Sequence, residues 1–506
     1  MRIAVIHGYF LSDSGSGIYV RELAREFRKQ GHEVTLVCQE QQPEQYDFID
    51  SAYQLDETNG ELRLVFAREV TEAGSCRLVR PHLGGRLLTY VAGPFPGFEA
   101  RPFQDAPDTL IDAYIEANGK ALAAIFNSWP PDLVQANHAV MQPYLVRRAL
   151  RETVSAPAAI RTPYIVTIHG SALNFTVRRD RRMVPYALDG LEEATAVAAL
   201  SSDSRTDVVE FARKEGLDIE NKSHVLPPGV DTGIFHPGYD RGRTLADISA
   251  GPAGSDAESD EEAGRISAGD DILTFTGRLL WTKGLQYAVA ALPLMLRERP
   301  RLRLLLAGDG PMREPLLGLI DTLDAGDLPA AEALLLSSEE LAAAAGFGPV
   351  LPAAESELRR RYRSCLDAVK GNLKNRIYFL GHVSHRQLAP LMAASDLVLA
   401  PSVFPEAFGL VAAEAMSAGV LPLATYQSGL KDPMDAVADE LGEPLLQSLA
   451  PGCDLTESLA DTVVRLLESR FTGSDEYRLI LHHLAGRLYS WEVPAARYLR
   501  FAVARG

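Results

Sequence analysis

The segment DLVLAPSVFPEAFGLVAAEAMSAGVLPLAT, residues 396–425, has the pattern of a strand, a glycine-containing turn, a helix and a second strand. Short apolar runs at 396–402 and 420–425 predict buried parallel strands. The helix of such a unit begins at the carboxyl end of a strand, where anionic ligands bind. Glu406 and Glu414 stand on either side of that predicted helix start. Paired carboxylates are typical of a hydrolase, whereas a glycine at a helix start is typical of a phosphate site, so the neighbouring segments must decide between them.

The same unit repeats along the whole chain. Strands are predicted at 3–6, 34–38, 132–138, 164–170, 196–200 and 224–230, and again at 271–277, 301–310, 376–383, 396–402 and 420–425. Alternation of short strands with helical patterns predicts parallel sheets covered on both faces. The expected fold class is therefore α/β, with two Rossmann-like, doubly wound domains in tandem. Such sheets bind ligands at the carboxyl ends of their strands, and a cleft between the domains is the expected active site.

Two segments interrupt this alternation. Residues 238–270 are acidic and poor in large apolar side chains, which predicts a solvated, poorly ordered loop near the domain boundary. Residues 318–370 are rich in Ala, Leu and Glu and predict two or three additional helices. The first domain is accordingly placed at 1–237 and the second, with its insertion, at 271–485.

Composition narrows the class of protein. A chain of 506 residues, 46% hydrophobic and 23% charged, is expected to be a soluble protein of two domains. Its net charge of -17 argues against a general nucleic-acid or anionic-membrane surface. The four cysteines lie far apart without metal-ligand spacing and predict reduced thiols in a cytoplasmic protein. The amino end predicts a first strand rather than a signal peptide, and no apolar run approaches the ~20 residues of a spanning helix, so that membrane contact is expected to be peripheral at most.

Glycines and histidines follow the predicted strands of the first domain. Gly15 and Gly17 precede the first helix, where glycine lets a backbone approach a phosphate or a sugar. The loop lacks the GxGxxG spacing and the next strand does not end in an acidic residue, which disfavours a nicotinamide dehydrogenase. His138 and His169 each follow a strand, where a ligand-facing group belongs. The ordinary alternatives are a glycine turn that only closes a connection and a histidine that is structural.

Cations follow a strand of the second domain. Arg278 and Lys283, in TGRLLWTKG (276–284), are suited to clamp a diphosphate, although either residue alone would be an ordinary solvated side chain. The turn at 380–384, which includes Val383, is placed to offer backbone groups to a nucleobase.

The helix start of the opening segment belongs to the same rim. Phe408, Gly409 and Leu410 would begin the helix, with N–H groups aimed at phosphates. A glycosidase needs neither this helix start nor the neighbouring cations. A sugar nucleotide accounts for all of these features, because the helix and the cations hold phosphate while Glu406 and Glu414 accept hydrogen bonds from hydroxyls.

Taken together, these motifs resemble the retaining GT-B glycosyltransferases of family 4. Glu406 and Glu414 are similar to the E-x7-E motif, TGRLLWTKG to the G-R-L-x-x-x-K-G element, and LLAGDGP (305–311) to the G-x-G-P turn. PPGVDTGIFHP (227–237) is similar to the N-G-V-D-x-x-x-F-x-P linker, and SWEVPAARYLRF (490–501) to the closing helix that crosses back to the first domain. The resemblance covers most of the chain in order. It implies a GT-B fold, with residues 486–506 completing the first domain.

The resemblance also implies a function and a set of roles. Family members transfer a sugar from a nucleotide donor with retention of configuration and without an essential metal or cofactor, and the donor here is expected to be UDP- or GDP-linked. The mechanism implied is front-face attack, in which the leaving phosphate helps to deprotonate the acceptor. By this resemblance, Arg278 and Lys283 would contact the diphosphate, Glu406 would bind hydroxyls of the donor sugar, and Glu414 would bind the ribose. Gly409 and Leu410 would offer backbone N–H groups. His169 would face the sugar, and Gly15 and Gly17 would lie at the donor–acceptor junction.

Some segments depart from the family pattern. Pro228 replaces the usual asparagine before Gly229, and residues 426–430 (YQSGL) stand where a Gly-Gly pair is common, so the pocket for the donor sugar is expected to differ. Four arginines follow His169 in TVRRDRRMVP (176–185). They are consistent with an anionic acceptor such as a sugar phosphate or a phosphorylated polyol, and also with a solvated or membrane-surface basic patch, which is the slightly favoured interpretation.

Other functions fit the same architecture. A sugar-nucleotide epimerase would convert the donor without an acceptor, whereas a phosphorylase would often carry a lysine-bound cofactor, for which the sequence shows no clear site. A sugar-nucleotide-binding or scaffold protein would bind the donor without turnover. The acceptor hydroxyl, on a sugar, a sugar phosphate, a polyol or a lipid-linked glycan, and the oligomeric state, with a homo-oligomer as one option, stay open.

Overall fold

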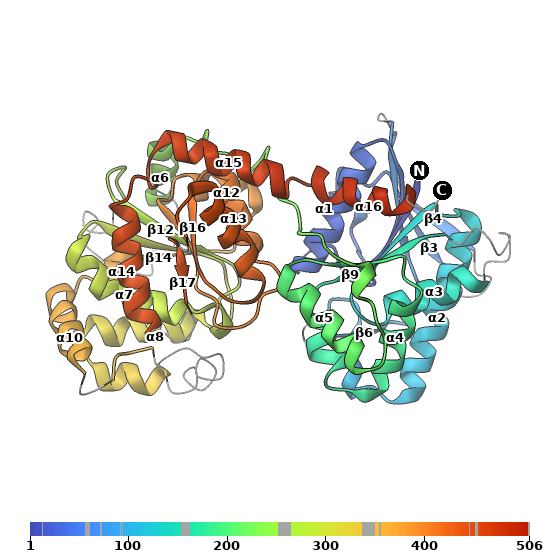
Figure 1. The fold of residues 1–506 in the computed structure, drawn as a ribbon, viewed down its shortest axis with the longest axis horizontal. Helices are drawn as coiled ribbons and strands as arrows, with labels where there is room; N and C mark the ends of the chain where they lie inside the picture. Colours follow the sequence, from blue (N-terminus) through green and yellow to red (C-terminus); the bar gives the residue numbers. More distant parts are fainter. Residues whose placement is uncertain are drawn as a thin grey trace. The chain divides into compact units, whose positions relative to one another are not determined.

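The computed structural model describes residues 1–503 except 13, 56–60, 71–72, 92, 94, 153–161, 251–264, 336–349, 354–355, 445 and 451–453 (Figure 1). The chain forms two compact units. The first comprises Met1–Gly229 with Trp491–Gly506, and the second comprises Val230–Ser490.

The first unit is built on a nine-stranded sheet. Its strand order is β11-β10-β9-β8-β1-β2-β5-β3-β4, and every pair is parallel except β3 with β4. The strands are β1 (Arg2–Ile6), β2 (Glu33–Val37), β3 (Ser51–Leu55), β4 (Leu62–Ala67), β5 (Ser75–Arg80), β8 (Leu133–Asn137), β9 (Tyr164–Ile168), β10 (Ala196–Ala199) and β11 (Ser223–Val225). A separate parallel pair joins β6 (Arg86–Thr89) to β7 (Glu99–Pro102).

Helices cover both faces of this sheet. α1 (Gly15–Lys29) packs against α16 (Glu492–Val503), whereas α2 (Asp108–Ser128), α3 (Gln142–Glu152) and α4 (Val184–Glu192) pack in succession on the other side (Figure 1). Val134 and Ala136 of β8 belong to the hydrophobic core shared with α2, α3 and α4. Because side chains alternate along a strand, Gln135 and Asn137 point to the opposite face, toward α16.

The second unit is built on a six-stranded parallel sheet, in the order β14-β13-β12-β15-β16-β17. Its strands are β12 (Asp271–Thr276), β13 (Leu302–Ala307), β14 (Ile377–Gly381), β15 (Leu397–Ala400), β16 (Leu421–Thr425) and β17 (Ser448–Leu449). α7 (Leu285–Glu298) is buried from Leu285 to Leu296 and packs against α14 (Leu455–Leu467). α12 (Leu410–Ser417) packs against α15 (Asp475–Tyr489).

The predicted fold class is confirmed, since both units are doubly wound α/β domains with parallel sheets. Each strand predicted from an apolar run is present, with its ends shifted by a few residues. The strands β3 to β7, β17 and the helix α2 were not predicted. The described units divide at Gly229/Val230 and Ser490/Trp491, rather than at the predicted positions 237 and 486.

The prediction of an unordered loop was wrong for the first part of 238–270. Residues Arg241–Ala250 form the helix α6, where Leu245 is fully buried. Asp240 caps this helix by accepting a hydrogen bond from the N–H of Arg243 at 2.8 Å. The acidic residues 251–264 lie outside the described residues.

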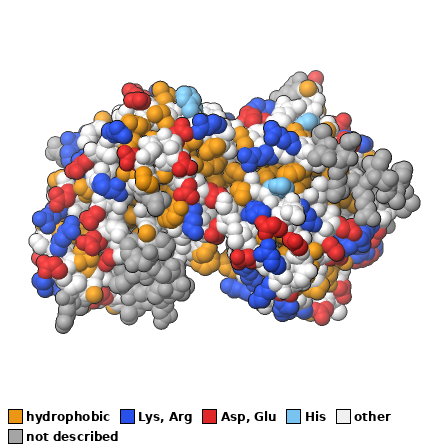
Figure 2. Space-filling view, viewed as in Figure 1, with side chains coloured by type: hydrophobic (Ala, Val, Ile, Leu, Met, Phe, Trp, Pro, Cys, Tyr) orange, Lys and Arg blue, Asp and Glu red, His pale blue; other side chains and the backbone are white. Residues whose placement is uncertain are grey.

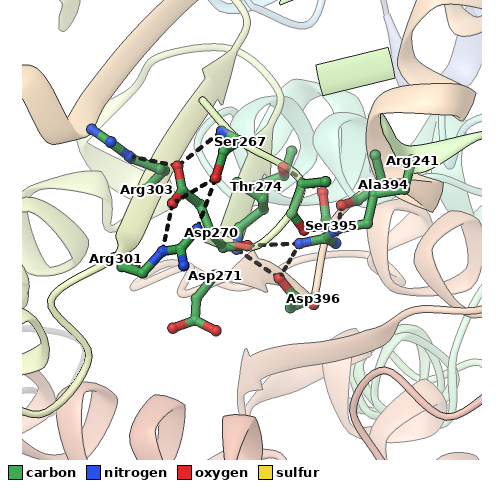
Figure 3. Close-up of polar contacts among 12 residues, drawn as sticks. Arg241, Ser267, Asp270, Asp271, Thr274, Arg301, Arg303, Ala394, Ser395 and Asp396 are labelled. Atoms are coloured by element: carbon green, nitrogen blue, oxygen red, sulfur yellow. Dashed lines mark hydrogen bonds and ion pairs between the residues drawn. The ribbon is translucent and has the colours of Figure 1, made fainter. Parts of the chain in front are cut away.

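Ion pairs hold α6 at the amino ends of the second sheet (Figure 3). Arg241 pairs with Asp396 at 2.8 Å and donates to the carbonyl oxygen of Asp270 at 2.7 Å. The Asp270 carboxylate in turn pairs with Arg301 and Arg303, each at 3.1 Å. This charged segment is therefore ordered because Arg241 and Asp270 have ion-pair partners, which composition alone does not reveal.

The predicted helical insertion at 318–370 is helical where it is described. It contains most of α8 (Arg313–Asp324), a helical stretch at 328–335 and α10 (Glu357–Val369), whereas 336–349 lie outside the described residues. The described cysteines Cys38, Cys76 and Cys365 are free and buried. Among the helices that the structure describes, none is long and apolar enough to cross a membrane.

Candidate active site

Lys283 and Glu406 form an ion pair at the carboxyl edge of the second sheet. Lys283 follows β12 and Glu406 follows β15, which are neighbours in that sheet. The carboxylate oxygen Oε1 of Glu406 accepts hydrogen bonds from the Lys283 ammonium and from the Ser402 hydroxyl. Oε2 makes no hydrogen bond with a described residue, and both side chains of the ion pair retain some exposure, 30% for the lysine and 23% for the glutamate. Oε2 is therefore available to accept from a ligand hydroxyl.

The backbone of Glu406 is held by the loop after β16. Its N–H donates to Ser428 Oγ at 2.8 Å, and its carbonyl oxygen accepts from the N–H of Gly429 at 2.9 Å. A Cβ atom at Gly429 would lie 2.5 Å from backbone atoms of Ala407 and Phe408, so only glycine fits there. Ser428 has φ 43°, a conformation that is uncommon for a serine, within the segment where a Gly-Gly pair was expected.

The helix α12 begins at a left-handed glycine. Gly409 has φ 96° and precedes Leu410, the first helical residue. A Cβ atom at Gly409 would lie 2.4 Å from Leu430 Cδ2, so the position excludes other residues both by conformation and by space. Phe408 is 2% exposed and its ring packs on Tyr489 at 5.3 Å, so only its backbone could serve a ligand.

Arg278 lies on the same edge, on the loop after β12. Its side chain is exposed, and its guanidinium makes no hydrogen bond or ion pair with any residue in the described part of the chain. Close glycine contacts shape this loop, because a Cβ atom at Gly308 would lie 1.9 Å from the carbonyl oxygen of Gly277. Arg278 is therefore a cation without a partner among the described residues, and it lies on the same loop and the same sheet edge as Lys283.

Glu414 has a different environment from Glu406. It is 8% exposed, on the buried side of α12, and burial raises its pKa to about 8. His385 Nε2 lies 3.7 Å from Glu414 Oε1. Val383, half-buried, lies two residues before His385 on the turn after β14, so this turn and Glu414 are brought together.

In the first unit, Gly15 and Gly17 occupy the first turn of α1. Ser14 caps this helix by accepting from the N–H of Gly17 at 3.0 Å. A Cβ atom at Gly17 would lie 2.7 Å from the carbonyl oxygen of Phe10, whereas at Gly15 it would meet open space. Gly17 is thus required by packing, and Gly15 leaves the helix start open to a ligand.

Three histidines follow adjacent strands of the first sheet. His7 follows β1, His138 follows β8 and His169 follows β9, and the ring centroids are 5.4 Å apart for His7–His138 and 5.0 Å for His138–His169. Burial lowers the pKa of His7 to about 4, partly offset by the backbone of Phe10, and lowers the pKa of His169 to about 3, with His7 adding to the effect. Burial also lowers the pKa of His138 well below its ordinary value. All three rings are therefore neutral at pH 7.

Several polar partners of the candidate site residues were not predicted from the sequence. Ser402 and Ser428 around Glu406, and Asn137 with its neighbours around His169, were not singled out. The signal was available for Asn137, since a buried strand that reads LVQAN places polar side chains where apolar ones are expected.

The arginine-rich segment after His169 is largely neutralised. Arg178 pairs with Asp207 at 2.7 Å, Arg181 with Glu215 at 2.6 Å, and Arg182 with Asp180 at 2.7 Å, while Arg179 stacks over the ring of Phe175 at 5.2 Å. The face drawn in Figure 2 likewise intersperses basic with acidic side chains. The charge available to an anion at this segment is therefore smaller than its sequence implies.

Two protein-family models match the sequence of this chain. The model described as Glycosyltransferase Family 4 matches residues 14–233, and that described as Glycosyl transferases group 1 matches residues 342–469. Both matched models are models of glycosyltransferases. Together the two matches cover about two thirds of the chain; the first lies almost entirely in the first unit and the second lies in the second unit.

Curated relatives match the chain over part of their length. A D-inositol 3-phosphate glycosyltransferase of Segniliparus rotundus is 28% identical over 232 residues, which are 46% of this chain and 37% of that protein. A glycogen synthase of Erwinia tasmaniensis is 22% identical over 400 residues, 76% of this chain and 68% of that protein. The chain thus spans only about a third of the first of these relatives.

Solved structures share the GT-B fold over the whole chain. A sucrose-phosphate synthase of Thermosynechococcus elongatus is 18% identical, with a TM-score of 0.59, covering 100% of this chain and 98% of that one. Anabaena HepE, solved in complex with UDP-glucose, is 16% identical with a TM-score of 0.55, covering 100% of both chains. At these identities the likeness concerns the fold alone.

The start of α12 is expected to tolerate no side chain at Gly409. We expect Gly409→Ala to lower the free energy of unfolding by about 3 kcal/mol, because it adds a clash with Leu430 to the cost of a left-handed alanine. Gly442→Ala is the matched control, since Gly442 has φ 70° but open space around its Cβ position, and should cost about 1 kcal/mol. Urea unfolding of both variants measures the difference, and equal losses would contradict the contact.

The histidine row is expected to make the first unit sensitive to acid. A histidine whose pKa is lowered by folding stays neutral in the native state but takes up a proton on unfolding below its ordinary pKa of about 6.5. The contribution of these neutral histidines to the free energy of unfolding is therefore complete above about pH 6.5. It falls as the pH drops toward the native-state pKa, which is about 4 for His7.

Comparison of His7→Phe with the parent between pH 7.5 and 5 tests this effect. The phenylalanine keeps a ring in the stack but cannot titrate, so the free energy of unfolding should fall less with acid than in the parent. His82→Asn in the same unit is the control, because His82 is not one of the three stacked histidines. Parallel pH profiles for His7→Phe and the parent would show that this histidine does not contribute.

Proposed function

We propose that this chain is a retaining glycosyltransferase that moves a hexosyl group from a UDP- or GDP-linked sugar to an acceptor hydroxyl, without an essential metal ion. The observation that carries the proposal is the arrangement around Glu406. A carboxylate with one free oxygen is paired with a lysine, and three residues later a left-handed glycine begins a helix. This combination suits a ligand that has hydroxyls next to phosphates.

The second unit would hold the donor. The N–H group of Leu410 at the start of α12 would donate to a phosphate oxygen, and the helix dipole would favour its negative charge. Lys283 has three N–H donors and can bond a phosphate while it still contacts Glu406. Arg278, exposed and without a partner among the described residues, would supply the second cation.

Glu406 is suited to bind a hydroxyl rather than to form a covalent intermediate. Its Oε1 already accepts from an ammonium and a hydroxyl group, which lowers its reactivity as a nucleophile. In the step that we propose, the bond from the anomeric carbon to the diphosphate oxygen breaks, and a bond to the acceptor oxygen forms on the same face of the sugar. The acceptor proton passes to the leaving diphosphate, whose growing charge Lys283 and Arg278 stabilise.

A thermal-shift panel of sugar nucleotides tests the proposal. A donor at a hundredfold excess over its Kd should stabilise the protein by about 2.7 kcal/mol. The donor that stabilises most is then incubated with and without candidate hydroxyl acceptors, and the products are separated. Transfer with retained configuration supports a glycosyltransferase, conversion without an acceptor indicates an epimerase, and binding without turnover under all conditions indicates a binding protein.

Lys283→Ala and Glu406→Gln test the assigned donor site. We expect each to lower kcat/KM for transfer by about a hundredfold or more, because a preorganised contact to the leaving diphosphate or to the sugar is lost. Lys374→Ala is the matched control, since Lys374 forms a similar ion pair with Asp321 at 2.8 Å on an exposed surface of the same unit. Near-parent activity in both site variants would refute the assignment.

The arginine-rich segment allows a test of the acceptor class. Because Arg178, Arg181 and Arg182 are already ion-paired, we expect replacement of these and Arg179 by glutamine to leave the KM for the acceptor unchanged. Steady-state kinetics at fixed donor measures this constant. A tenfold rise would instead establish an anionic acceptor bound at this segment.

A further inference from the structure

A continuous row of buried polar side chains lies on the α16 face of the first sheet. Gln135 and Asn137 of β8 and Thr167 of β9 are each 0% exposed, although parallel strands are usually apolar on both faces. Buried polar groups persist where hydrogen bonds satisfy them, so the partners of these three side chains define what the row does.

The amide of Asn137 can have only one orientation. Its Nδ2 lies 2.9 Å from the carbonyl oxygen of Ile6 and 2.7 Å from Gln135 Oε1. A backbone carbonyl can only accept, so the amide nitrogen must face it; the reversed amide would place two acceptors against each other. Asn137 Oδ1 therefore faces Gln135 Nε2, which donates to it at 2.8 Å, and His169 Nε2, also at 2.8 Å.

This orientation determines the tautomer of His169. An amide oxygen only accepts, so the proton of the neutral imidazole must lie on Nε2. Nδ1 then carries a lone pair, and it makes no hydrogen bond with any residue in the described ranges. The His169 ring also meets the edge of Tyr19, with centroids 5.2 Å apart and an interplanar angle of 77°, which restricts its rotation.

The row continues from the sheet to the last helix of the chain. Gln135 Nε2 also donates to Thr167 Oγ1 at 2.6 Å, and the Thr167 hydroxyl is hydrogen-bonded to Tyr498 OH, 2.6 Å away. Tyr498 lies on α16 and its hydroxyl is 2.9 Å from that of Tyr19. Tyr498 is 0% exposed and Tyr19 is 1% exposed.

We propose that Asn137 is a positioning residue that holds His169 as the Nε2–H tautomer, and that Tyr498 of α16 supports it through Thr167 and Gln135. The Nδ1 lone pair is thereby kept free to accept a hydrogen bond from a substrate hydroxyl. That last consequence rests on the proposed function. The tautomer itself does not, because it follows from contacts within the first unit.

NMR of the full chain with 15N-labelled histidine reads the tautomer directly, without substrate. His169→Gln removes one spectrum and so assigns it. In the parent protein at pH 7, we expect His169 to bear its proton on Nε2 alone. A proton on Nδ1, or a mixture of the two forms, overturns the proposal.

Substitutions at Asn137 test the cause of the tautomer. Asn137→Leu removes the acceptor and should give a mixture of tautomers. Asn137→Asp retains an acceptor, so it should keep the proton on Nε2 while its charge raises the pKa of His169 above the parent value. The groups that face this ring are His7, His138 and Tyr19, and they are unchanged in all of these variants. An unchanged tautomer in Asn137→Leu overturns the role of Asn137.

Asn118→Leu is the matched control. Asn118 is 5% exposed in the same unit and donates to the carbonyl oxygen of Tyr114 at 2.9 Å, but it has no contact with His169. It should lose stability without changing the His169 spectrum. If Asn137→Leu does not fold, the parent and Asn137→Asp spectra still decide the proposal.

Activity supplies a separate readout. Tyr498→Phe removes only the hydroxyl that α16 contributes to the row, and we expect kcat to fall by about tenfold or more with little change in KM, since a misplaced group costs rate more than binding. An unchanged kcat overturns the supporting role of α16. If no sugar nucleotide is turned over by the parent, the proposed function fails, whereas the spectra still test the tautomer.

Discussion

The position of Glu406 depends on how closely the loops after β15 and β16 approach one another. The N–H of Gly429 reaches the Glu406 carbonyl oxygen at 2.9 Å, and a Cβ atom at Gly429 would be 2.5 Å from the neighbouring backbone. Backbone contact therefore sets where this carboxylate lies before any ligand binds. The pairing with Lys283 and the left-handed start of α12 at Gly409 follow from the same loop geometry. A site held in this way needs little reorganisation when charge develops on a leaving group.

In the first unit, a different kind of contact holds the candidate group in place. There the candidate group, His169, is oriented by side chains inside the strands rather than by contact between loops. Hydrogen bonds among buried amides and hydroxyls are directional, so they fix an orientation and a proton position that apolar packing would leave free. Tyr498 of α16, a helix far away in sequence, adds a hydroxyl to the row, so the carboxyl-terminal helix takes part in the buried polar network of the first unit.

Sequence reasoning succeeded where a single physical signal dominates. Apolar runs closed by glycine identified the strands that carry the site, and parallel strands ending at one edge placed Lys283 and Glu406 on the same rim although they are 123 residues apart. It failed where stability comes from pairing across the chain. α6 is charged and was expected to be unordered, yet Arg241 and Asp396 hold it, and β4 was missed because its side chains are mostly exposed. The hydrogen bond between His169 and Asn137 needs coordinates, since sequence places both residues only at strand ends.

Burial determines the protonation states of the candidate groups, which residue types alone do not reveal. His169 is neutral at pH 7 because its pKa is lowered to about 3, so it can accept or donate a hydrogen bond but cannot act there as a cationic acid. Glu414 keeps its proton up to about pH 8, so it can donate to a ribose oxygen as well as accept from a hydroxyl. At neutral pH His169 is too weak a base to hold the proton of an acceptor hydroxyl, and Glu414 already carries a proton and cannot take up another. In the function that we propose, the leaving diphosphate would receive that proton, so the geometry around Lys283 and Glu406 would bear on rate as well as on binding.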